Sequence, residues 1–184
     1  MTTPLPLPAE QPTLETERLI LRPYALSDAS ELSRAINDFA VADTTLNIPH
    51  PYPDGAAADY ISSRLPAYTT GKEISFVLTL SDTGRLIGAM GLVATPRFNH
   101  AEIGYWIARA EWNQGYATEA AQAVVRFGFE TWGLHKIVGT HLRRNPASGR
   151  VMEKVGLQFE GVLRDHTIKW DRYEDLVIRG LVRT

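Results

Sequence analysis

The passage from 101 to 132 constrains the fold more than any other part of the chain, because a strand, a glycine-containing turn and a long helix follow one another directly. Residues 101–108 have the apolar and aromatic composition of a strand. Apolar residues at 117, 120, 121, 124, 125 and 129 then form a broad helical face over 115–132, and Gly133 stands where that helix ends. Because each element must bury its apolar face against a second layer, the passage favours an α/β layout.

The same patterns predict the remaining elements of one mixed sheet flanked by helices. Strands are expected over 17–23, 74–80, 85–94, 101–108, 136–142, 157–163 and 175–182, and helices over 27–38, from 54 through 65, over 115–132 and over 145–156. The segment 47–53 contains three prolines and is expected to be an extended loop. We therefore predict a single α/β domain over 13–184 with a central sheet of about six to seven strands. A loose arm with four prolines is expected over 1–12.

Charge and composition exclude several classes of function. The 184 residues contain 19 Lys and Arg against 21 Asp and Glu, a formal net charge of −2, which disfavours nucleic acid and an anionic membrane as partners. The chain has no cysteine, which excludes disulfides, thiolate zinc sites and a cysteine nucleophile, and its five histidines show no metal-ligand spacing. No apolar run approaches the roughly 20 residues that span a bilayer, and the first residues resemble no secretion signal. We expect a soluble, cytoplasmic protein without a metal.

The segment from Glu111 to Ala120 is the strongest candidate for a binding site. Backbone N–H groups at the start of a helix have no partner within the helix and lie at the positive end of its dipole, so they bind anions. Gly115 lets the backbone approach a ligand closely and Ala117 keeps the next position small, which suits a pyrophosphate. An ordinary helix that begins at a glycine explains the same residues. The nucleotide-triphosphate loop and the dinucleotide fingerprint are both missing.

These residues resemble the pyrophosphate loop of the GNAT superfamily of N-acetyltransferases. That loop follows a Gln/Arg-x-x-Gly-x-Gly/Ala pattern, which falls here on residues 112–117 with Trp112 in place of the first Gln or Arg. In the RimJ/RimL-like branch, which acetylates protein N-termini and other amines, the loop commonly reads Trp-x-x-Gly-Tyr-Ala-Thr-Glu-Ala, as residues 112–120 do. Further likeness lies, in the order of the family, at 16–23, 102–107, 145–148, 153–157, 161–164 and 173–175.

The resemblance implies a GNAT fold in which two central strands diverge and form a cleft for acetyl-coenzyme A. It implies transfer of the acetyl group to a primary amine, either a protein N-terminal α-amine or a small molecule, by direct attack in a ternary complex. Backbone N–H groups of the cleft would stabilise the oxyanion. Two alternatives stay open: a catalytically inactive acyl-CoA-binding module, and an adaptor for nucleic acid or ribosomes. Homodimers formed through a sheet edge or through the arm are compatible with the sequence.

The resemblance distributes the coenzyme over several segments. The cofactor-binding candidates are Tyr105, Trp106, Ile107, Asn113, Gln114, Gly115, Tyr116, Ala117, Thr118, Asn145, Arg150 and Lys154. Residues 105–107 are expected to pair with the pantetheine arm through their backbone, or to be core alone. A role as the helix N-cap before Pro146 is enough to explain Asn145. The resemblance also implies that Asn145 contacts the coenzyme near the thioester. Arg150 and Lys154 would meet the ribose 3′-phosphate, although charges on an exposed helix are commonly only solvated.

The catalytic candidates are Glu102 and Ser148. An ammonium ion has no lone pair, so a base or a water chain must remove a proton before the nitrogen attacks. Glu102 lies ten positions before Trp112, the spacing at which several family members hold a catalytic carboxylate. A water wire to backbone carbonyls is the main alternative for the base, and a surface ion pair with a nearby arginine would explain Glu102 structurally. Ser148 is expected to hydrogen-bond the leaving thiolate, because Val151 and Met152 occupy the region where many family members carry a tyrosine.

His50 and Tyr52 lie in the proline-rich segment 47–53, which matches the branch's variable loop beside the acceptor cleft. The resemblance makes both of them substrate-binding candidates, and a structural loop with satisfied side chains explains them as well. The sequence does not name the amine, since likeness of fold does not determine the substrate.

Overall fold

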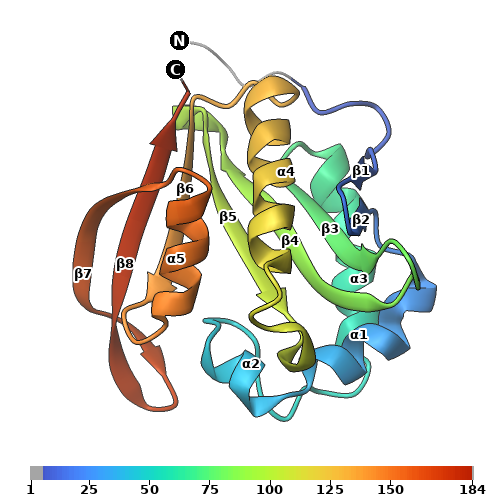
Figure 1. Ribbon diagram of the computed structural model, residues 1–184, viewed down its shortest axis with the longest axis horizontal. Coiled ribbons are helices and arrows are strands. Elements are labelled where there is room, and N and C mark those ends of the chain that lie inside the picture. The colour runs from blue at the N-terminus through green and yellow to red at the C-terminus, as the bar shows by residue number, and fades with distance from the viewer. Residues whose placement is uncertain (1–5, 184) are drawn as a thin grey trace.

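An open β-sheet lies between two layers of helices in the computed structural model, which describes residues 6–183 (Figure 1). The strands are β1 (Leu14–Glu15), β2 (Leu19–Arg22), β3 (Glu73–Leu80), β4 (Leu86–Thr95), β5 (His100–Ile107), β6 (Lys136–Leu142), β7 (Gln158–Lys169) and β8 (Arg172–Val182). The helices are α1 (Ala29–Ile36), α2 (Phe39–Asp43), α3 (Ala56–Thr69), α4 (Tyr116–Glu130) and α5 (Pro146–Lys154). Their order is the predicted one, with β1 and α2 added, and the α/β fold class is confirmed.

The described strands form one eight-stranded sheet in the order β1-β2-β3-β4-β5-β6-β8-β7. Neighbouring strands pair antiparallel except β5 and β6, which pair parallel because α4 carries the chain back across the sheet. The sheet has one strand more than the upper bound of the prediction. The additional strand is β1, which pairs with β2 over only two residues, Leu14↔Leu21 and Glu15↔Ile20. So short a strand has no periodicity by which the sequence could reveal it.

Helices cover both faces of this sheet. α4 and α5 lie on the face toward the viewer in Figure 1, and α1 and α3 lie behind it. The larger core joins the sheet to α4 through side chains such as Phe76, Leu92 and Val124, and a smaller core joins it to α1 and α3. Burial of each such side chain contributes about 1.5–3 kcal/mol. The two cores therefore hold the central strands, which carry the site, between two packed layers.

The last two strands are longer than predicted, although β6 begins and ends at the predicted residues. β7 continues beyond the predicted end at 163 to Lys169, and most of this edge strand is exposed, so its sequence lacks an apolar alternation. Its register shifts between Leu163 and Thr167, where Asp165 has a φ of 47°. The chain turns at Trp170 and Asp171, which both have positive φ, as a type I′ hairpin turn requires.

α2 is the helix that the sequence analysis missed. It has only five residues, fewer than a helical pattern needs, and Asp38 caps it by accepting a hydrogen bond from the Ala40 N–H at 2.7 Å. The segment that follows it, up to α3, has no regular structure, as predicted for 47–53. Among the described residues, no helix is both long enough and apolar enough to cross a bilayer.

The predicted arm over 1–12 falls partly outside the described residues. In its described part, the Tyr68 hydroxyl donates to the carbonyl groups of Pro8, at 2.6 Å, and Glu10, at 3.1 Å. The Gln11 side-chain amide donates to the Ser75 carbonyl at 2.9 Å. Residues 8–11 thus contact the domain, and the looseness of the arm stays a prediction.

Candidate active site

The turn between β5 and α4 presents unpaired amides. Gly115 is the N-cap residue of α4 with a φ of 87°, a conformation that favours glycine, and Asn113 has a φ of 63°. No side chain caps the helix, and within residues 6–183 the N–H groups of 113–117 have no hydrogen-bond acceptor. Amides grouped at a helix N-terminus bind phosphate oxygens. The turn therefore has the geometry that a pyrophosphate requires.

Trp112, which departs from the family's loop pattern, anchors this turn to the end of β5. Its indole N–H donates to the Ile107 carbonyl at 2.7 Å, and the Arg109 guanidinium lies 4.5 Å from its ring centroid. The ring also packs against both hydrophobic cores. A partly buried indole needs such an acceptor. The substitution of tryptophan for Gln or Arg thus keeps the turn fixed by packing and one hydrogen bond.

Thr16 and Arg18, which precede β2, form hydrogen bonds with the same turn and with the first turn of α4. Glu119, in the first turn of α4, accepts hydrogen bonds from the Thr16 hydroxyl at 2.6 Å, the Arg18 backbone N–H at 2.8 Å and the Arg18 Nε at 2.8 Å. Arg18 Nη1 in turn donates to the Gln114 carbonyl at 3.0 Å. Burial raises the pKa of Glu119, but the hydrogen bonds from Thr16 and Arg18 outweigh it and hold that pKa below its ordinary value. Two motifs of the sequence analysis therefore meet in one contact.

β5 and β6 separate beyond Ile103. Their parallel pairing runs from His100↔Lys136 to Ile103↔Gly139 and stops there. β5 nevertheless continues to its end along β4, and β6 continues along β8. The edge of β5 over 104–107 that faces β6 consequently has no partner strand, which confirms the predicted divergence. An extended ligand can pair with such an edge as an added strand.

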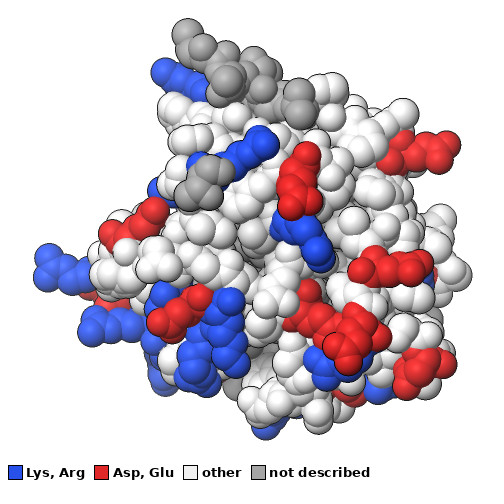
Figure 2. Space-filling model, turned by 45° about the horizontal axis from the view of Figure 1, so that its top comes forward, with Lys and Arg blue, Asp and Glu red and all other residues white. Residues whose placement is uncertain are grey.

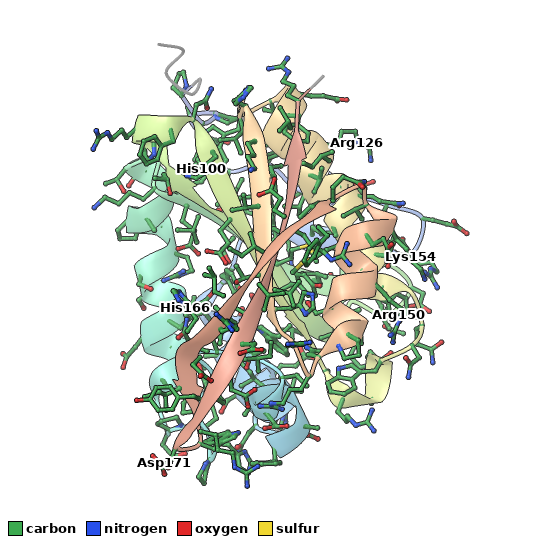
Figure 3. All side chains as sticks on the ribbon, turned by 90° about the vertical axis from the view of Figure 1, so that its left-hand side faces the viewer. His100, Arg126, Arg150, Lys154, His166 and Asp171 are labelled. Carbon is green, nitrogen blue, oxygen red and sulfur yellow. The ribbon has the colours of Figure 1, made fainter. Side chains whose placement is uncertain are left out.

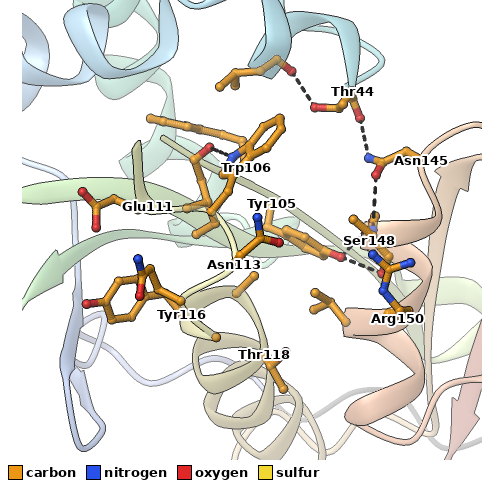
Figure 4. Close-up of a pocket in the computed structure, with 18 of the residues that line it drawn as sticks. Thr44, Tyr105, Trp106, Glu111, Asn113, Tyr116, Thr118, Asn145, Ser148 and Arg150 are labelled. Carbon is orange, nitrogen blue, oxygen red and sulfur yellow. Dashed lines mark hydrogen bonds between the residues drawn. The ribbon is translucent and has the colours of Figure 1, made fainter. Parts of the chain in front are cut away.

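A cavity of about 500 Å³ opens between this edge, the turn and α5 (Figure 4). All twelve predicted cofactor-binding residues line it, together with Ser148. The structure adds Val41, Thr44 and Thr45, which the sequence analysis missed because they belong to α2 and the turn after it. The structure therefore brings the predicted residues together on one surface, and their binding roles stay predictions.

Basic side chains border this cavity on the side of α5. Arg150 and Lys154 lie one turn apart on the exposed part of that helix (Figure 3). Neither has a carboxylate partner within the described part of the chain. On the face in Figure 2, basic side chains gather over the side of α5, β7 and β8, whereas acidic side chains gather over the opposite side. Two such cations suit a phosphate group.

A chain of hydrogen bonds runs along one wall of the cavity (Figure 4). The Tyr105 hydroxyl lies 2.8 Å from Ser148 Oγ and 3.1 Å from the Ser148 carbonyl oxygen. Asn145 Oδ1 accepts from the Ser148 N–H at 3.3 Å, and Asn145 Nδ2 donates to the Thr44 carbonyl at 3.2 Å. Asn145 is thus the helix cap that the sequence predicts. Burial raises the pKa of Tyr105 to about 12, against the opposing effect of its hydrogen bond with Ser148.

A second cavity, of about 490 Å³, reaches the α3 side of the diverging strands. Side chains of α3 and β3 form part of its wall, as do residues 44–48 of the loop after α2. It shares five lining residues with the first cavity, namely Thr44, Thr45, Tyr105, Trp106 and Ser148. The two cavities therefore meet where β5 and β6 have separated.

Glu102 lies in the wall of the second cavity. Its Oε1 accepts a hydrogen bond from the Thr140 hydroxyl at 2.7 Å. The expected ion pair between Glu102 and an arginine is not formed within residues 6–183. The arginine in this wall, Arg64, pairs with Glu73 at 2.5 Å instead. Glu102 thus brings an unneutralised carboxylate to the cavity.

Lys169, at the tip of the β7–β8 hairpin, holds the loop that forms part of this wall. Its ammonium group donates to the carbonyl groups of Leu46, at 3.3 Å, and Ile48, at 2.8 Å. Burial lowers the pKa of Lys169, which is only 6% exposed. The adjacent Trp170 indole N–H donates to Asp43 at 2.9 Å. The part of the hairpin that the sequence analysis missed therefore positions the wall of the second cavity.

His50 and Tyr52 line neither of these two cavities. The His50 ring packs edge-on against Phe39, with 5.6 Å between the ring centroids. Tyr52 packs against the smaller core, and its backbone N–H donates to the Asn37 side chain at 2.9 Å. These packing contacts agree with a structural loop, but His50 Nδ1 is buried without a hydrogen-bond partner among the described residues, so the expectation of satisfied side chains is wrong for His50. A contact of either residue with an acceptor stays a prediction.

Comparison with known proteins places this geometry in a family. The family model of the acetyltransferase (GNAT) domain matches residues 18–158. YoaA, an uncharacterized N-acetyltransferase of Bacillus subtilis, is 33% identical over 156 residues, which cover 84% of this chain and 88% of YoaA.

Solved structures show the same likeness. A GNAT-family acetyltransferase from Bacillus anthracis superposes with a TM-score of 0.82 at 25% identity, over 92% of this chain and 98% of that one. RimL, the ribosomal L7/L12 alpha-N-protein acetyltransferase solved with coenzyme A, has a TM-score of 0.83 at 17% identity, over 91% of this chain and 95% of RimL. The likeness to RimL is one of fold alone.

Proposed function

The chain belongs to the GNAT acetyltransferase family, and we propose that it acetylates a primary amine by direct attack of that amine on acetyl-coenzyme A in a ternary complex. Its family and its named relatives make it an acetyl-CoA-dependent N-acetyltransferase. The observation that carries the proposal is the meeting of two cavities at Tyr105 and Ser148, across strands that have separated. A donor in one cavity and an acceptor in the other would react there without a covalent enzyme intermediate, so catalysis rests mainly on positioning.

In this proposal the first cavity binds the coenzyme, which supplies the acetyl thioester. The amides of 113–117 bind the pyrophosphate, because they lack acceptors within the described chain and lie at the positive end of the α4 dipole. The free edge of β5 over 104–107 pairs with the pantetheine arm. Arg150 and Lys154 bind the terminal phosphate from their exposed positions on α5.

The second cavity binds the amine. Because Arg64 is neutralised by Glu73 while Glu102 has no cationic partner in the described residues, the wall has an excess of negative charge. Such a wall attracts an ammonium group and repels an acceptor with a carboxylate beside its amine. A peptide N-terminus, the acceptor type in RimL's name, and a small polyamine or amino sugar both satisfy this condition.

The chain's own residues then have separate tasks in the transfer. Glu102 removes a proton from the ammonium group, directly or through water, so that the nitrogen lone pair can attack the thioester carbon. Backbone N–H groups of the free β5 edge stabilise the oxyanion. Ser148 donates a hydrogen bond to the sulfur as the C–S bond breaks. An α-amine with a pKa of about 8 needs less help from Glu102 than a lysine amine with a pKa of about 10.4.

Thiol release from acetyl-CoA, measured against a panel of N-terminal peptides, polyamines and amino sugars, tests this function. We expect release with at least one amine, and weaker release when the same amine has a carboxylate beside it. Glu102→Gln should lower kcat by about 10²-fold, the usual contribution of a general base. Glu130→Gln, at an exposed position of α4 that lines neither of the two cavities, is the matched control and should keep the wild-type rate.

The two alternatives predict different results in the same experiment. Tight coenzyme binding with no thiol release from any amine would support an inactive acyl-CoA-binding module. A chain that fails to bind coenzyme at all would support an adaptor. Either result would contradict the proposed transfer.

A further inference from the structure

The Tyr105 side chain occupies the junction of the two cavities, although its sequence position suggested only a backbone role. Tyr105 lies on β5 just past the point where β6 separates, and its hydroxyl is 2.8 Å from Ser148 Oγ. It lines both cavities, as Ser148 does. The remaining shared hydroxyls belong to Thr44 and Thr45, which donate to carbonyl groups of α2, Thr44 to Ala40 at 2.9 Å and Thr45 to Val41 at 3.1 Å. Among the hydroxyl groups of the lining residues common to both cavities, those of Tyr105 and Ser148 are the pair that contact each other, so a proton can pass between them.

Ser148 alone is a poor source of a proton. A serine hydroxyl that protonates a thiolate becomes an alkoxide, which is a much stronger base than the thiolate it has neutralised. The step becomes favourable only if the serine oxygen regains a proton as it gives one up. The Tyr105 phenol, whose pKa burial raises from the ordinary 10 to about 12, is a weaker acid than a free phenol but still a better acid than an alcohol, and it can return a proton to the serine oxygen.

We propose that the Tyr105 hydroxyl supplies, through Ser148 Oγ, the proton that the coenzyme sulfur takes up when acetyl transfer breaks the C–S bond. The inference rests on the proposed function of this site. As the N–C bond forms and the C–S bond breaks, the electron pair of the C–S bond goes to sulfur, which takes the Ser148 proton. Ser148 takes the Tyr105 proton, and the resulting phenolate is reprotonated from solvent. The nitrogen gives one proton to Glu102 before it attacks and a second proton to water as the amide forms, while sulfur gains one, so the transfer releases one proton overall.

The surroundings of Tyr105 suit this task. Burial raises the pKa of its phenol to about 12, so the group keeps its proton over the whole pH range in which amines are assayed. The phenol oxygen lies 2.8 Å from Ser148 Oγ and 3.1 Å from the Ser148 carbonyl oxygen, so its single proton has Ser148 Oγ as the nearer of two acceptors. Val151 and Met152, on α5, have no acidic hydrogen and cannot supply a proton to the leaving thiolate. Tyr105, on β5, supplies it instead. Tyr105 acts through Ser148 and does not itself have to touch the substrate.

Tyr105→Phe tests the relay, with Tyr68→Phe as the matched control. Tyr68 is also a buried tyrosine whose hydroxyl donates to a backbone carbonyl, but it lines neither of the two cavities. We expect Tyr105→Phe to lower kcat by about 10²-fold, as loss of a general acid does, with the KM for acetyl-CoA and the calorimetric affinity for coenzyme A unchanged. Tyr68→Phe should keep the wild-type kcat.

The double variant Tyr105→Phe/Ser148→Ala distinguishes a relay from two separate effects. Residues that act as one unit show losses that do not multiply, so the double variant should be no slower than the slower single variant. Multiplied losses would overturn the relay. A Tyr105→Phe enzyme that loses coenzyme affinity together with kcat would also overturn it, because the hydroxyl would then have a structural role.

A readout other than activity comes from a difluorotyrosine at 105, whose fluorines lower the phenol pKa. Fluorine NMR of the free protein should show a titration that shifts in the Ser148→Ala variant, and the high-pH fall of kcat should move to the pH of that titration. A kcat profile that does not follow the measured phenol pKa would contradict the proposal. If the wild-type enzyme released no thiol with any amine, the proposed function and the relay would both be wrong. A wild-type kcat in Tyr105→Phe refutes the relay alone.

Discussion

Glu119→Ala should destabilise the protein more than removal of the arginine with which Glu119 forms its ion pair. The Glu119 carboxylate accepts from the Thr16 hydroxyl and the Arg18 backbone N–H, and it also pairs with the Arg18 guanidinium at 2.7 Å. The Glu119 side chain is 16% exposed and that of Arg18 is 43% exposed. The hydrogen bonds to Thr16 and to the strand are therefore better shielded from water than the ion pair is.

The expected magnitudes follow from this difference in exposure. A hydrogen bond to a charged group contributes about 1.5–3 kcal/mol, and Glu119→Ala removes two that do not involve the guanidinium, so we expect a loss of about 2–4 kcal/mol after partial compensation by water. An ion pair as exposed as that of Arg18 contributes about 0–1 kcal/mol. Arg18→Met keeps its backbone N–H and the apolar stem, so it should lose about 1 kcal/mol.

Urea unfolding followed by tryptophan fluorescence measures both variants, with an unchanged m-value as the check that the same surface unfolds. Coenzyme affinity should fall in both, because Arg18→Met removes the hydrogen bond to the Gln114 carbonyl and Glu119→Ala removes the carboxylate that positions the donating guanidinium. If Glu119→Ala lowers the free energy of unfolding no more than Arg18→Met does, the ion pair is the main interaction and this reasoning is refuted.

Three further predictions concern the turn, the acceptor loop and acid stability. Trp112→Phe removes the hydrogen bond to the Ile107 carbonyl, so stability should fall by about 1 kcal/mol and the KM for acetyl-CoA should rise in steady-state kinetics; an unchanged KM would contradict the anchoring role. Lys169→Met releases two loop carbonyls and should raise the KM for the amine, but not that for acetyl-CoA. Burial raises the pKa of Asp28, but hydrogen bonds from Arg22 outweigh it and leave that pKa below its ordinary value. The stability that Asp28 contributes is therefore present above its unfolded pKa and lost as the pH falls below about 4, and Asp28→Asn should flatten that part of the pH dependence of unfolding.

The parts of the site that the sequence predicted are those that depend on neighbouring residues. The turn at Gly115 needs a positive φ, and the amides around it belong to consecutive residues, so the spacing alone indicates an anion site. Asn145 before Pro146 marks a helix start in the same local way, and the structure has that cap. Long elements with buried faces, such as α4 and β6, were predicted for the same reason.

The parts that the sequence did not reveal depend on contacts between distant segments. Tyr105 and Ser148 lie 43 positions apart, and Thr16 and Glu119 lie 103 positions apart. No pattern within one segment indicates that such residues touch. The predicted strands of the β7–β8 hairpin were too short, because an exposed strand has no apolar alternation. The contacts of Lys169 with the loop were therefore not predicted either. His50 and Tyr52 were predicted to contact the substrate because of their place in the proline-rich loop. The residues that line the second cavity lie a few positions earlier, at 44–48.

Calorimetric binding of coenzyme A to Gly115→Val, beside Gly55→Val, tests the central claim most directly. Both glycines are helix N-caps with positive φ, 87° at Gly115 and 80° at Gly55, so valine costs about 1–2 kcal/mol of strain at each. An added Cβ meets no described atom within 4 Å at Gly55 and only Arg18 Nη2, at 3.4 Å, at Gly115, so both variants should fold. Gly115 lines the first cavity and Gly55 does not. We predict that Gly115→Val loses coenzyme binding while Gly55→Val binds as the wild type does; a folded Gly115→Val that binds coenzyme A with wild-type affinity would contradict the account.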